Sequence, residues 1–313
     1  MKPRTHPGGE AFCPAWTDYE LLDSGSARKL ERFGTVTLVR PEPQANWAPR
    51  LPEESWSAAH ARFVLDESTK MREPKRGEWK ALRPVRTRWQ MRRNQIVFWV
   101  QLTPSGHVGV FPDQASHWDW LAAVISAAPA PPKVLSLFGH TGLASLSAAA
   151  SGAHVTHVDA SRKAVTWARE NQVLSQLADR PIRWIVDDAA TFVAREIRRG
   201  HVYDGLILDP PRFGRGPKGQ LWKSSEALPT LLTECSRLLS AAPLFVLLNT
   251  YTTVVTSGQS AREAAQLRTF LTGMLQGCPA SIAAGELYLS DSGGRRISAS
   301  VFARATAAGR RVT

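Results

Sequence analysis

A regular alternation of strand-like and helix-like segments between residues 133 and 249 constrains the fold most. Five short apolar runs predict buried strands, at residues 133–138, 155–159, 182–186, 203–209 and 244–249. Segments with helical spacing of apolar residues lie between them, at 142–151, 161–174, 190–199 and 227–239. Strands that alternate with helices and are apolar on both faces predict an α/β fold with a parallel, doubly wound, Rossmann-like sheet.

The two ends of the chain follow other patterns. Residues 285–290 and 297–304 predict two strands joined by a polar turn at 291–294, which is typical of an antiparallel hairpin. Residues 33–39, 86–92 and 95–102 predict strands, and 114–127 predicts a helix. A proline-rich connector at 127–132 then interrupts the pattern. We therefore expect a smaller β-rich α+β domain over residues 1–127 and the doubly wound domain over 128–313.

Charge and cysteine content narrow the class of protein. The chain has 39 Lys and Arg against 27 Asp and Glu, a net charge of +12, which favours a polyanionic partner such as nucleic acid. Cys13, Cys235 and Cys278 lack the spacing of a zinc site or a disulfide framework, so we expect no metal and a reducing cytoplasm. We also expect no membrane association, since no apolar run approaches the ~20 residues of a membrane helix.

The residues that end the predicted strands indicate a cofactor site, because ligands bind beyond the carboxyl ends of parallel strands. Gly139 and Gly142 allow a sharp turn and close approach to a ligand, although a structural turn would explain them too. Asp159 follows Gly139 by the ~20 residues expected of a carboxylate that accepts the hydroxyls of a ribose. Asp188 is the candidate ligand of an adenine amine, with Asp187 left open and a helix cap as the alternative. Their neighbours Phe138, Thr141, Ala160 and Ala189 complete this predicted site.

The end of the fourth strand discriminates between cofactors. The features above fit NAD as well as S-adenosylmethionine, but a hydride-transfer enzyme has no use for the rigid turn of residues 209–213. Its two prolines, of which Pro210 is the first, fix the backbone so that the Asp209 carboxylate points at one place. A planar, amine-bearing base would lie there, and Phe213 could stack on it. We therefore expect S-adenosylmethionine as cofactor, with Asp209 contacting both cofactor and substrate.

Four segments carry a resemblance to a known family: VLSLFGHTGLAS, VTHVDASRKAVTWARENQ, IVDDA and LDPPRF. Residues 134–251 resemble the bacterial 23S ribosomal RNA methyltransferases of the cytosine-C5 type and their relatives. Residues 107–114 resemble the family segment that borders the cofactor, which implies a cofactor contact for Gln114. Residues 1–94 are similar to a largely uncharacterised subgroup of such methyltransferases. The resemblance implies a seven-stranded methyltransferase sheet that ends in an antiparallel pair, with ribosomal RNA as substrate.

Three departures from the family pattern matter. Ala115 replaces the family's arginine, and no RNA-binding PUA-like domain is recognisable near the N-terminus. The cytosine-C5 enzymes carry a cysteine after the fifth strand, where this chain has Asn249, Thr250 and Tyr251. C5 of cytosine is a poor nucleophile until a thiolate adds to C6, so we expect methylation at a nitrogen instead. Cys235 lies among leucines on a predicted helix, and we expect it in the core.

Two basic segments are the candidate RNA contacts. Residues 70–93 contain ten positive and two negative side chains interleaved with Trp79 and Trp89, which could stack on unpaired bases or lie in the core. A second basic segment follows the predicted catalytic turn. The predicted RNA-binding residues are Arg83, Arg86, Arg88, Arg92, Arg93, Arg215 and Lys218.

The sequence leaves alternatives open. The favoured function is methylation of a ribosomal RNA base. A methyltransferase for a small molecule or a protein, or an RNA-binding protein that has lost catalysis, would share many of these features. The oligomeric state is not indicated.

Overall fold

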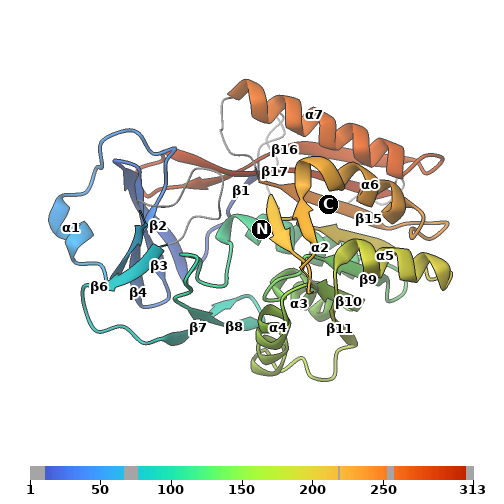
Figure 1. Cartoon of the computed structure of the whole chain (residues 1–313), viewed down its shortest axis with the longest axis horizontal. Helices are drawn as coiled ribbons and strands as arrows, with labels where there is room; N and C mark the ends of the chain where they lie inside the picture. The colour runs from blue at the N-terminus through green and yellow to red at the C-terminus, as the bar shows by residue number, and fades with distance from the viewer. Residues whose placement is uncertain (1–10, 67–76, 218, 252–256, 308–313) are drawn as a thin grey trace.

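A computed structural model describes residues 11–66, 77–217, 219–251 and 257–307 (Figure 1). An eight-stranded sheet has the order β1-β16-β17-β15-β12-β9-β10-β11. Five parallel strands form most of it: β9 (Lys133–Leu137), β10 (His154–Asp159), β11 (Ile182–Val186), β12 (Gly205–Leu208) and β15 (Phe245–Thr250). The strand order reverses at β9, which lies between β10 and β12, and such a switch point is where ligands bind in open α/β sheets.

The other end of this sheet is antiparallel. β16 (Ala280–Ser290) and β17 (Arg296–Ala307) form a long hairpin, and β17 pairs antiparallel with β15. The predicted Rossmann-like sheet with a terminal antiparallel pair is thus confirmed. The two-residue strand β1 (Ala11–Phe12), which the sequence analysis did not foresee, adds an eighth strand parallel to β16.

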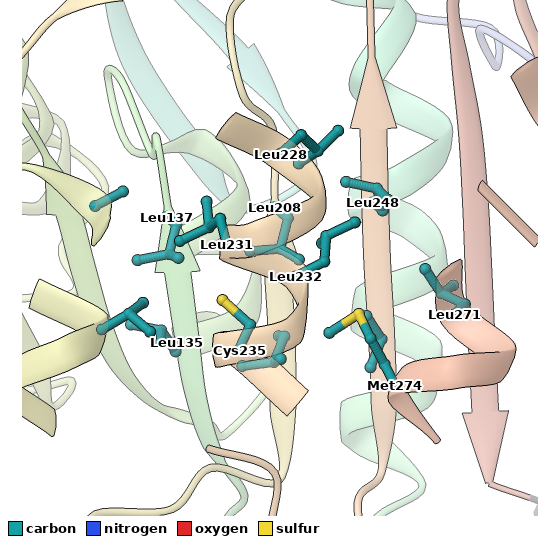
Figure 2. Close-up of a cluster of buried hydrophobic side chains, with 14 of the residues drawn as sticks. Leu135, Leu137, Leu208, Leu228, Leu231, Leu232, Cys235, Leu248, Leu271 and Met274 are labelled. Atoms are coloured by element: carbon teal, nitrogen blue, oxygen red, sulfur yellow. The ribbon is translucent and has the colours of Figure 1, made fainter. Parts of the chain in front are cut away.

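Successive side chains of each strand point to opposite faces of the large sheet. Because the side chains on both faces are apolar, helices cover both faces. Leu206 and Leu208 of β12 pack in one cluster with α5 (Ala189–Arg198), α6 (Ser224–Ser236) and α7 (Ser257–Met274). Ile207 between them packs in a second cluster with α2 (Ala115–Ser126) and α3 (Leu143–Ala150). α4 (Arg162–Leu174) lies against β10 and β11 and is capped, as expected, by the Ser161 hydroxyl. Figure 2 shows the first cluster, in which Cys235 is fully buried among leucines, as predicted.

A second, five-stranded sheet forms near the N-terminus, in the order β2 (Tyr19–Gly25), β3 (Arg28–Phe33), β4 (Val36–Pro41), β5 (Ala61–Leu65) and β6 (Gly77–Ala81), with α1 (Glu53–Ser57) beside it. The prediction of one strand over residues 33–39 is wrong. Phe33 ends β3, Val36 begins β4, and Gly34 turns the chain between them with φ of +62°. A positive φ suits glycine, which lacks a Cβ, and it breaks the apparent run of strand-forming residues.

The N-terminal part is joined to the large sheet by several contacts. β7 (Arg88–Arg93) and β8 (Ile96–Gln101) form a separate ladder that packs on α4, and α2 packs on α3. The tip of the β16–β17 hairpin reaches the five-stranded sheet (Figure 1), where the Ser24 hydroxyl donates to Asp291 at 2.8 Å and Arg295 pairs with Asp23. The division into domains at residues 127 and 128 stays a prediction.

Candidate functional site

The glycine turn between β9 and α3 has an unusual backbone. Phe138, His140 and Gly142 have positive φ angles of 59°, 49° and 87°, and the Gly142 N–H donates to the Gly139 carbonyl at 2.9 Å. Gly139 lies against a side chain of the next strand: a Cβ there would be 2.3 Å from Cε1 of His157. The turn therefore brings the backbone close to the neighbouring strand end and opens directly into α3.

Asp159, the last residue of β10, is attached to this turn. Its Oδ2 accepts a hydrogen bond from the His140 N–H and its Oδ1 accepts one from the Ser161 N–H, both at 2.8 Å. A carboxylate oxygen can accept more than one hydrogen bond, so capacity remains for hydroxyl groups of a ligand. The two bonds hold Asp159 beside the glycine turn, where the sequence analysis placed the ribose.

The paired aspartates after β11 have partners within the protein. Oδ1 of Asp188 accepts from both the backbone N–H and the hydroxyl of Thr191 at 2.9 Å, which makes Asp188 the N-cap of α5. Asp187 forms an ion pair with Arg195 at 2.7 Å. The helix-cap alternative therefore describes the contacts of Asp188 in this structure.

Asp209 follows β12 and is the centre of a hydrogen-bonded cluster. Asn249 Nδ2 donates to its Oδ1 at 2.9 Å, and the Tyr251 hydroxyl donates to its Oδ2 at 3.2 Å. Gln114, from the short 3-10 helix η1 (Pro112–Gln114), donates to Asp209 at 3.4 Å and to the Tyr251 oxygen at 3.1 Å. Two separate parts of the chain, η1 and the end of β15, thus fix the orientation of one carboxyl group.

The surroundings of Asp209 raise its pKa toward neutral pH. Burial raises the pKa of Asp209 to about 7; the hydrogen bond from Asn249 opposes this rise, the nearby Asp113 adds to it, and the Tyr251 hydroxyl opposes it. Burial also raises the pKa of Asp113 to about 6. The site therefore holds a carboxyl group that can exchange a proton near pH 7.

One cleft joins Asp209 to the glycine turn. Of the sequence-predicted residues, it brings together Gln114, Phe138, Gly139, Thr141 and Asp209. Asn249, His117 and Ser136 also line it. The remaining predicted cofactor and catalytic residues lie outside its lining: Gly142, Asp159, Ala160, Asp188, Ala189, Pro210 and Phe213.

A short hairpin follows the proline turn. β13 (Phe213–Arg215) pairs antiparallel with β14 (Leu221–Lys223), so part of the second basic segment forms a hairpin. Trp222 Nε1 donates to the Pro211 carbonyl at 2.6 Å, and its ring lies 4.8 Å from that of Phe138. This tryptophan connects the proline turn to the glycine turn. Phe213 is exposed, with the Arg212 guanidinium 5.4 Å from its ring.

Comparison with known proteins identifies the family. The family model described as S-adenosylmethionine-dependent methyltransferase matches residues 19–267. The chain belongs to this family. It is similar to a crystal structure of a SAM-dependent methyltransferase from Agrobacterium tumefaciens, with 39% identity, a TM-score of 0.87 and coverage of 96% of this chain and 94% of that one.

Curated relatives match a shorter stretch of this methyltransferase. The ribosomal RNA large subunit methyltransferase K/L of Syntrophotalea carbinolica is 34% identical over 127 residues, which is 40% of this chain and 17% of that protein. The protein of the same name from Hahella chejuensis is 30% identical over 151 residues, 48% of this chain and 20% of that protein. The chain thus spans about a fifth of the length of these relatives.

The first basic segment of the methyltransferase is only partly available for a ligand. Arg83, Arg86 and Arg92 are exposed. Arg88, in contrast, pairs with Glu170 and lies 4.6 Å from the ring centre of Trp99, and the buried Arg93 pairs with Asp119. Residues 70–76 of this segment lie outside the described residues.

The two tryptophans of this segment are held by the protein. Trp89 is buried and donates to the Phe33 carbonyl at 2.9 Å, so of the two alternatives left open by the sequence the core position is the one observed. Trp79 is partly buried and donates to the Thr103 carbonyl at 2.7 Å. In the second basic segment Arg215 is exposed, and Lys218 lies outside the described residues.

The three cysteines lie away from the cleft. Cys13 is partly buried, with its thiol pKa raised by burial to about 12; Cys235 is fully buried and Cys278 partly buried. None of the three, all of which fall in the described ranges, lines the cleft. Over the same ranges, no group of three or more His, Cys, Asp or Glu residues is arranged to hold a metal ion, and no helix has the length and apolar character to cross a membrane.

Sequence reasoning missed several polar residues that surround the site. His117 of α2, and Ser300 and Arg304 of β17, contact one another or Asn249 behind Asp209. The sequence analysis noted residues 249–251 for the cysteine they lack, and it did not foresee that Asn249 and Tyr251 bind Asp209. Their position at the end of a parallel strand was the one usable signal.

Proposed function

We propose that this methyltransferase methylates a nitrogen atom of a ribosomal RNA base in the cytoplasm. The observation that carries the proposal is the Asp209 cluster, a buried carboxyl group oriented by Asn249 and Tyr251 in the cleft that leads to the glycine turn. The curated relatives are named as ribosomal RNA large subunit methyltransferases, which supports the choice of substrate.

The residues present fit S-adenosylmethionine, which supplies the methyl group when bound. The Ser136 hydroxyl faces the cleft, is buried, and has no hydrogen-bond partner among the described residues, so a polar group of a ligand has a place there. Asp159 would accept the ribose hydroxyls, and the N-terminus of α3 would face the carboxylate of the methionine moiety. Phe138, Gly139, Thr141, Gly142 and Gln114 would line the bound molecule, with Ala160, Asp188 and Ala189 near its adenine.

In this proposal Asp209 orients the nitrogen acceptor. Its oxygens accept hydrogen bonds from Asn249 and Tyr251, and a free lone pair can accept an N–H of the base. A pKa near 7 also lets Asp209 take up the proton that the nitrogen loses. Pro210, a buried residue of the turn, fixes the backbone, and the exposed Phe213 offers a face for the base.

The cysteines support nitrogen over carbon as the methylated atom. Methylation at C5 of a pyrimidine requires a thiolate beside the base, whereas Cys235 is buried in the core and burial raises the pKa of Cys13 to about 12. RNA that contains 5-fluorocytosine tests this point, because it traps a covalent adduct with a catalytic cysteine. We expect no adduct, and an adduct lost in a single Cys→Ser variant would restore the C5 reaction.

Phosphate contacts would come from the exposed arginines. Arg83, Arg86, Arg92 and Arg215 are available on the surface, and the net charge of +12 attracts a polyanion over a longer range. The ion pairs of Arg88 with Glu170 and Arg93 with Asp119 leave these two side chains with structural roles as well.

The function is tested by nucleoside analysis. Ribosomal RNA from a strain without the gene should lack one methylated base, found by mass spectrometry, and the wild-type gene should restore it while Asp209→Asn should not. Purified protein with radiolabelled S-adenosylmethionine should then label RNA from the deletion strain. Identical modification in both strains, with label transferred to a protein or small molecule of the extract, would replace RNA as the substrate class.

A further inference from the structure

A chain of polar side chains extends from Asp209 into the interior of the protein. Behind Asn249, which donates to Asp209, lies the ring of His117, whose Nε2 is 3.5 Å from Asn249 Oδ1. On the far side of the ring, Arg304 Nε donates to His117 Nδ1 at 2.8 Å. Ser300 adds a second donor, because its hydroxyl donates to Asn249 Oδ1 at 2.9 Å.

The direction of every hydrogen bond in this chain is fixed by its innermost member. A guanidinium group has donors and no acceptor, so His117 Nδ1 must accept and the ring proton must lie on Nε2. The Nε2–H then donates to Asn249 Oδ1. With its oxygen turned toward His117 and Ser300, the amide of Asn249 must present its Nδ2 donor to Asp209.

We propose that Arg304 and His117 are positioning residues, which act through Asn249 to hold a hydrogen-bond donor on the carboxylate of Asp209. The inference rests on the proposed role of Asp209 in the acceptor site. It assigns a purpose to groups that the described cofactor and substrate contacts do not use.

The location of Arg304 supports this assignment. Its side chain is buried, and burial lowers its pKa to about 9, which the carboxylate of Asp119 only partly offsets. At neutral pH the group is therefore a buried cation. The guanidinium carbon lies 4.8 Å from the ring centre of Phe302 and 5.4 Å from that of Trp120. An apolar side chain could pack against these rings equally well, so packing alone does not explain a buried charge at this position. Burial and the charge of Arg304 lower the pKa of His117, which keeps its ring neutral as the chain of hydrogen bonds requires.

Other groups that face Asp209 come from different elements and stay unchanged when Arg304 or His117 is replaced. Asp113 of η1 raises the pKa of Asp209, and the hydroxyl of Tyr251 after β15 donates to it. His117 is neutral, so a change in the titration of Asp209 on replacement of His117 would report the loss of orientation at Asn249 without a change of charge.

The test follows the carboxyl carbon of Asp209 by NMR in protein labelled with carbon-13 at aspartate, with the signal assigned by its loss in Asp209→Asn. The variants are made in a Ser300→Ala chain, so that His117 is the donor left on the Asn249 oxygen. Arg304→Met and His117→Leu should each raise the apparent pKa of Asp209 by about one unit relative to Ser300→Ala alone, the scale of one hydrogen bond to a charged group.

His117→Gln is the matched control. A glutamine amide can accept from Arg304 and donate to Asn249, so this variant should titrate close to Ser300→Ala. Equal titration in all variants, or an equal shift in the Gln and Leu variants, would overturn the inference. The His117 pair decides the question if Arg304→Met fails to fold. The titration needs neither RNA nor cofactor, so its result is independent of whether ribosomal RNA is the substrate.

Discussion

Gly139 is the position where the glycine turn passes closest to a neighbouring strand, and Gly139→Ala tests that packing. The new Cβ would be 2.3 Å from Cε1 and 2.4 Å from Nδ1 of His157. The ring cannot move aside freely, because it is fully buried, hydrogen bonded to the Ser145 hydroxyl at 2.9 Å and packed 4.6 Å from the ring of Trp184. Since Cβ contacts under 3.0 Å are essentially never seen, the ring or the turn must shift by about 0.7 Å.

The expected magnitude follows from this overlap. Overpacking of a well-packed site costs about 1–3 kcal/mol. With an unfolding entropy of about 2.1 cal/mol/K per residue over 313 residues, the Tm should fall by roughly 2–5 °C. Displacement of the turn should also weaken S-adenosylmethionine binding by about tenfold, the equivalent of one lost hydrogen bond to a charged group.

Scanning calorimetry and isothermal titration with S-adenosylmethionine measure the two effects. The matched control is Gly273→Ala in α7, where a Cβ meets no other atom within 4 Å, and which should raise stability by up to about 1 kcal/mol. If Gly139→Ala kept the wild-type Tm and affinity, the reasoning would be refuted, because the site would then accommodate a Cβ beside the His157 ring.

Four further predictions concern the site and the surface. Asp159→Ala should reduce S-adenosylmethionine affinity by roughly 10- to 150-fold in calorimetry, and unchanged affinity would remove Asp159 from the site. The pKa of Asp209 is about 7 in the folded protein, against an ordinary value of 3.8. Between these pH values the folded state binds one proton more than the unfolded state, so the free energy of unfolding should fall as pH rises from about 4 to 7. The Tm of Asp209→Asn should therefore depend less on pH than the Tm of the wild type. Replacing Arg86 and Arg92 with Glu should weaken RNA binding and lower its salt slope, measured by filter binding, and should leave cofactor affinity intact. A variant with all three cysteines changed to Ser should keep its methylation rate, with a lower Tm because Cys235 is buried.

The sequence predicted the central strands of the large sheet and the helices between them well, because each is a local pattern, whereas β1 and the helix α7 were not predicted. The strand at Ile182–Val186 and the Ser161 cap of α4 coincide with the prediction. The errors arose where local patterns compete with tertiary structure. A run of strand-forming residues hid the turn at Gly34, and the basic context of Trp89 left open whether its ring stacks on a base or lies in the core, which tertiary packing decides.

The site was predictable only to the extent that strand ends define it. Asp209 and Gly139 were found because parallel strands bring their carboxyl ends together. The contact of His117 with Asn249 joins residues 132 positions apart, and that of Arg304 with His117 joins residues 187 apart. No local pattern encodes such contacts, because they depend on how α2 and β17 meet the sheet.

The pairing of β1 with β16 has a consequence for how the chain folds during synthesis. Ala11 lies opposite Leu287, a separation of 276 residues. At a translation rate of about 5–20 residues per second, the partner of β1 leaves the ribosome on the order of 15–55 s after β1 itself. The strands of residues 19–81 can pair with one another long before then. The ion pair between Asp23 and Arg295 forms only after Arg295 has been synthesised, which takes about as long as for the partner of β1. β1 therefore cannot take its place beside β16 until residues near 287 have been synthesised, so the large sheet gains this edge strand late in folding.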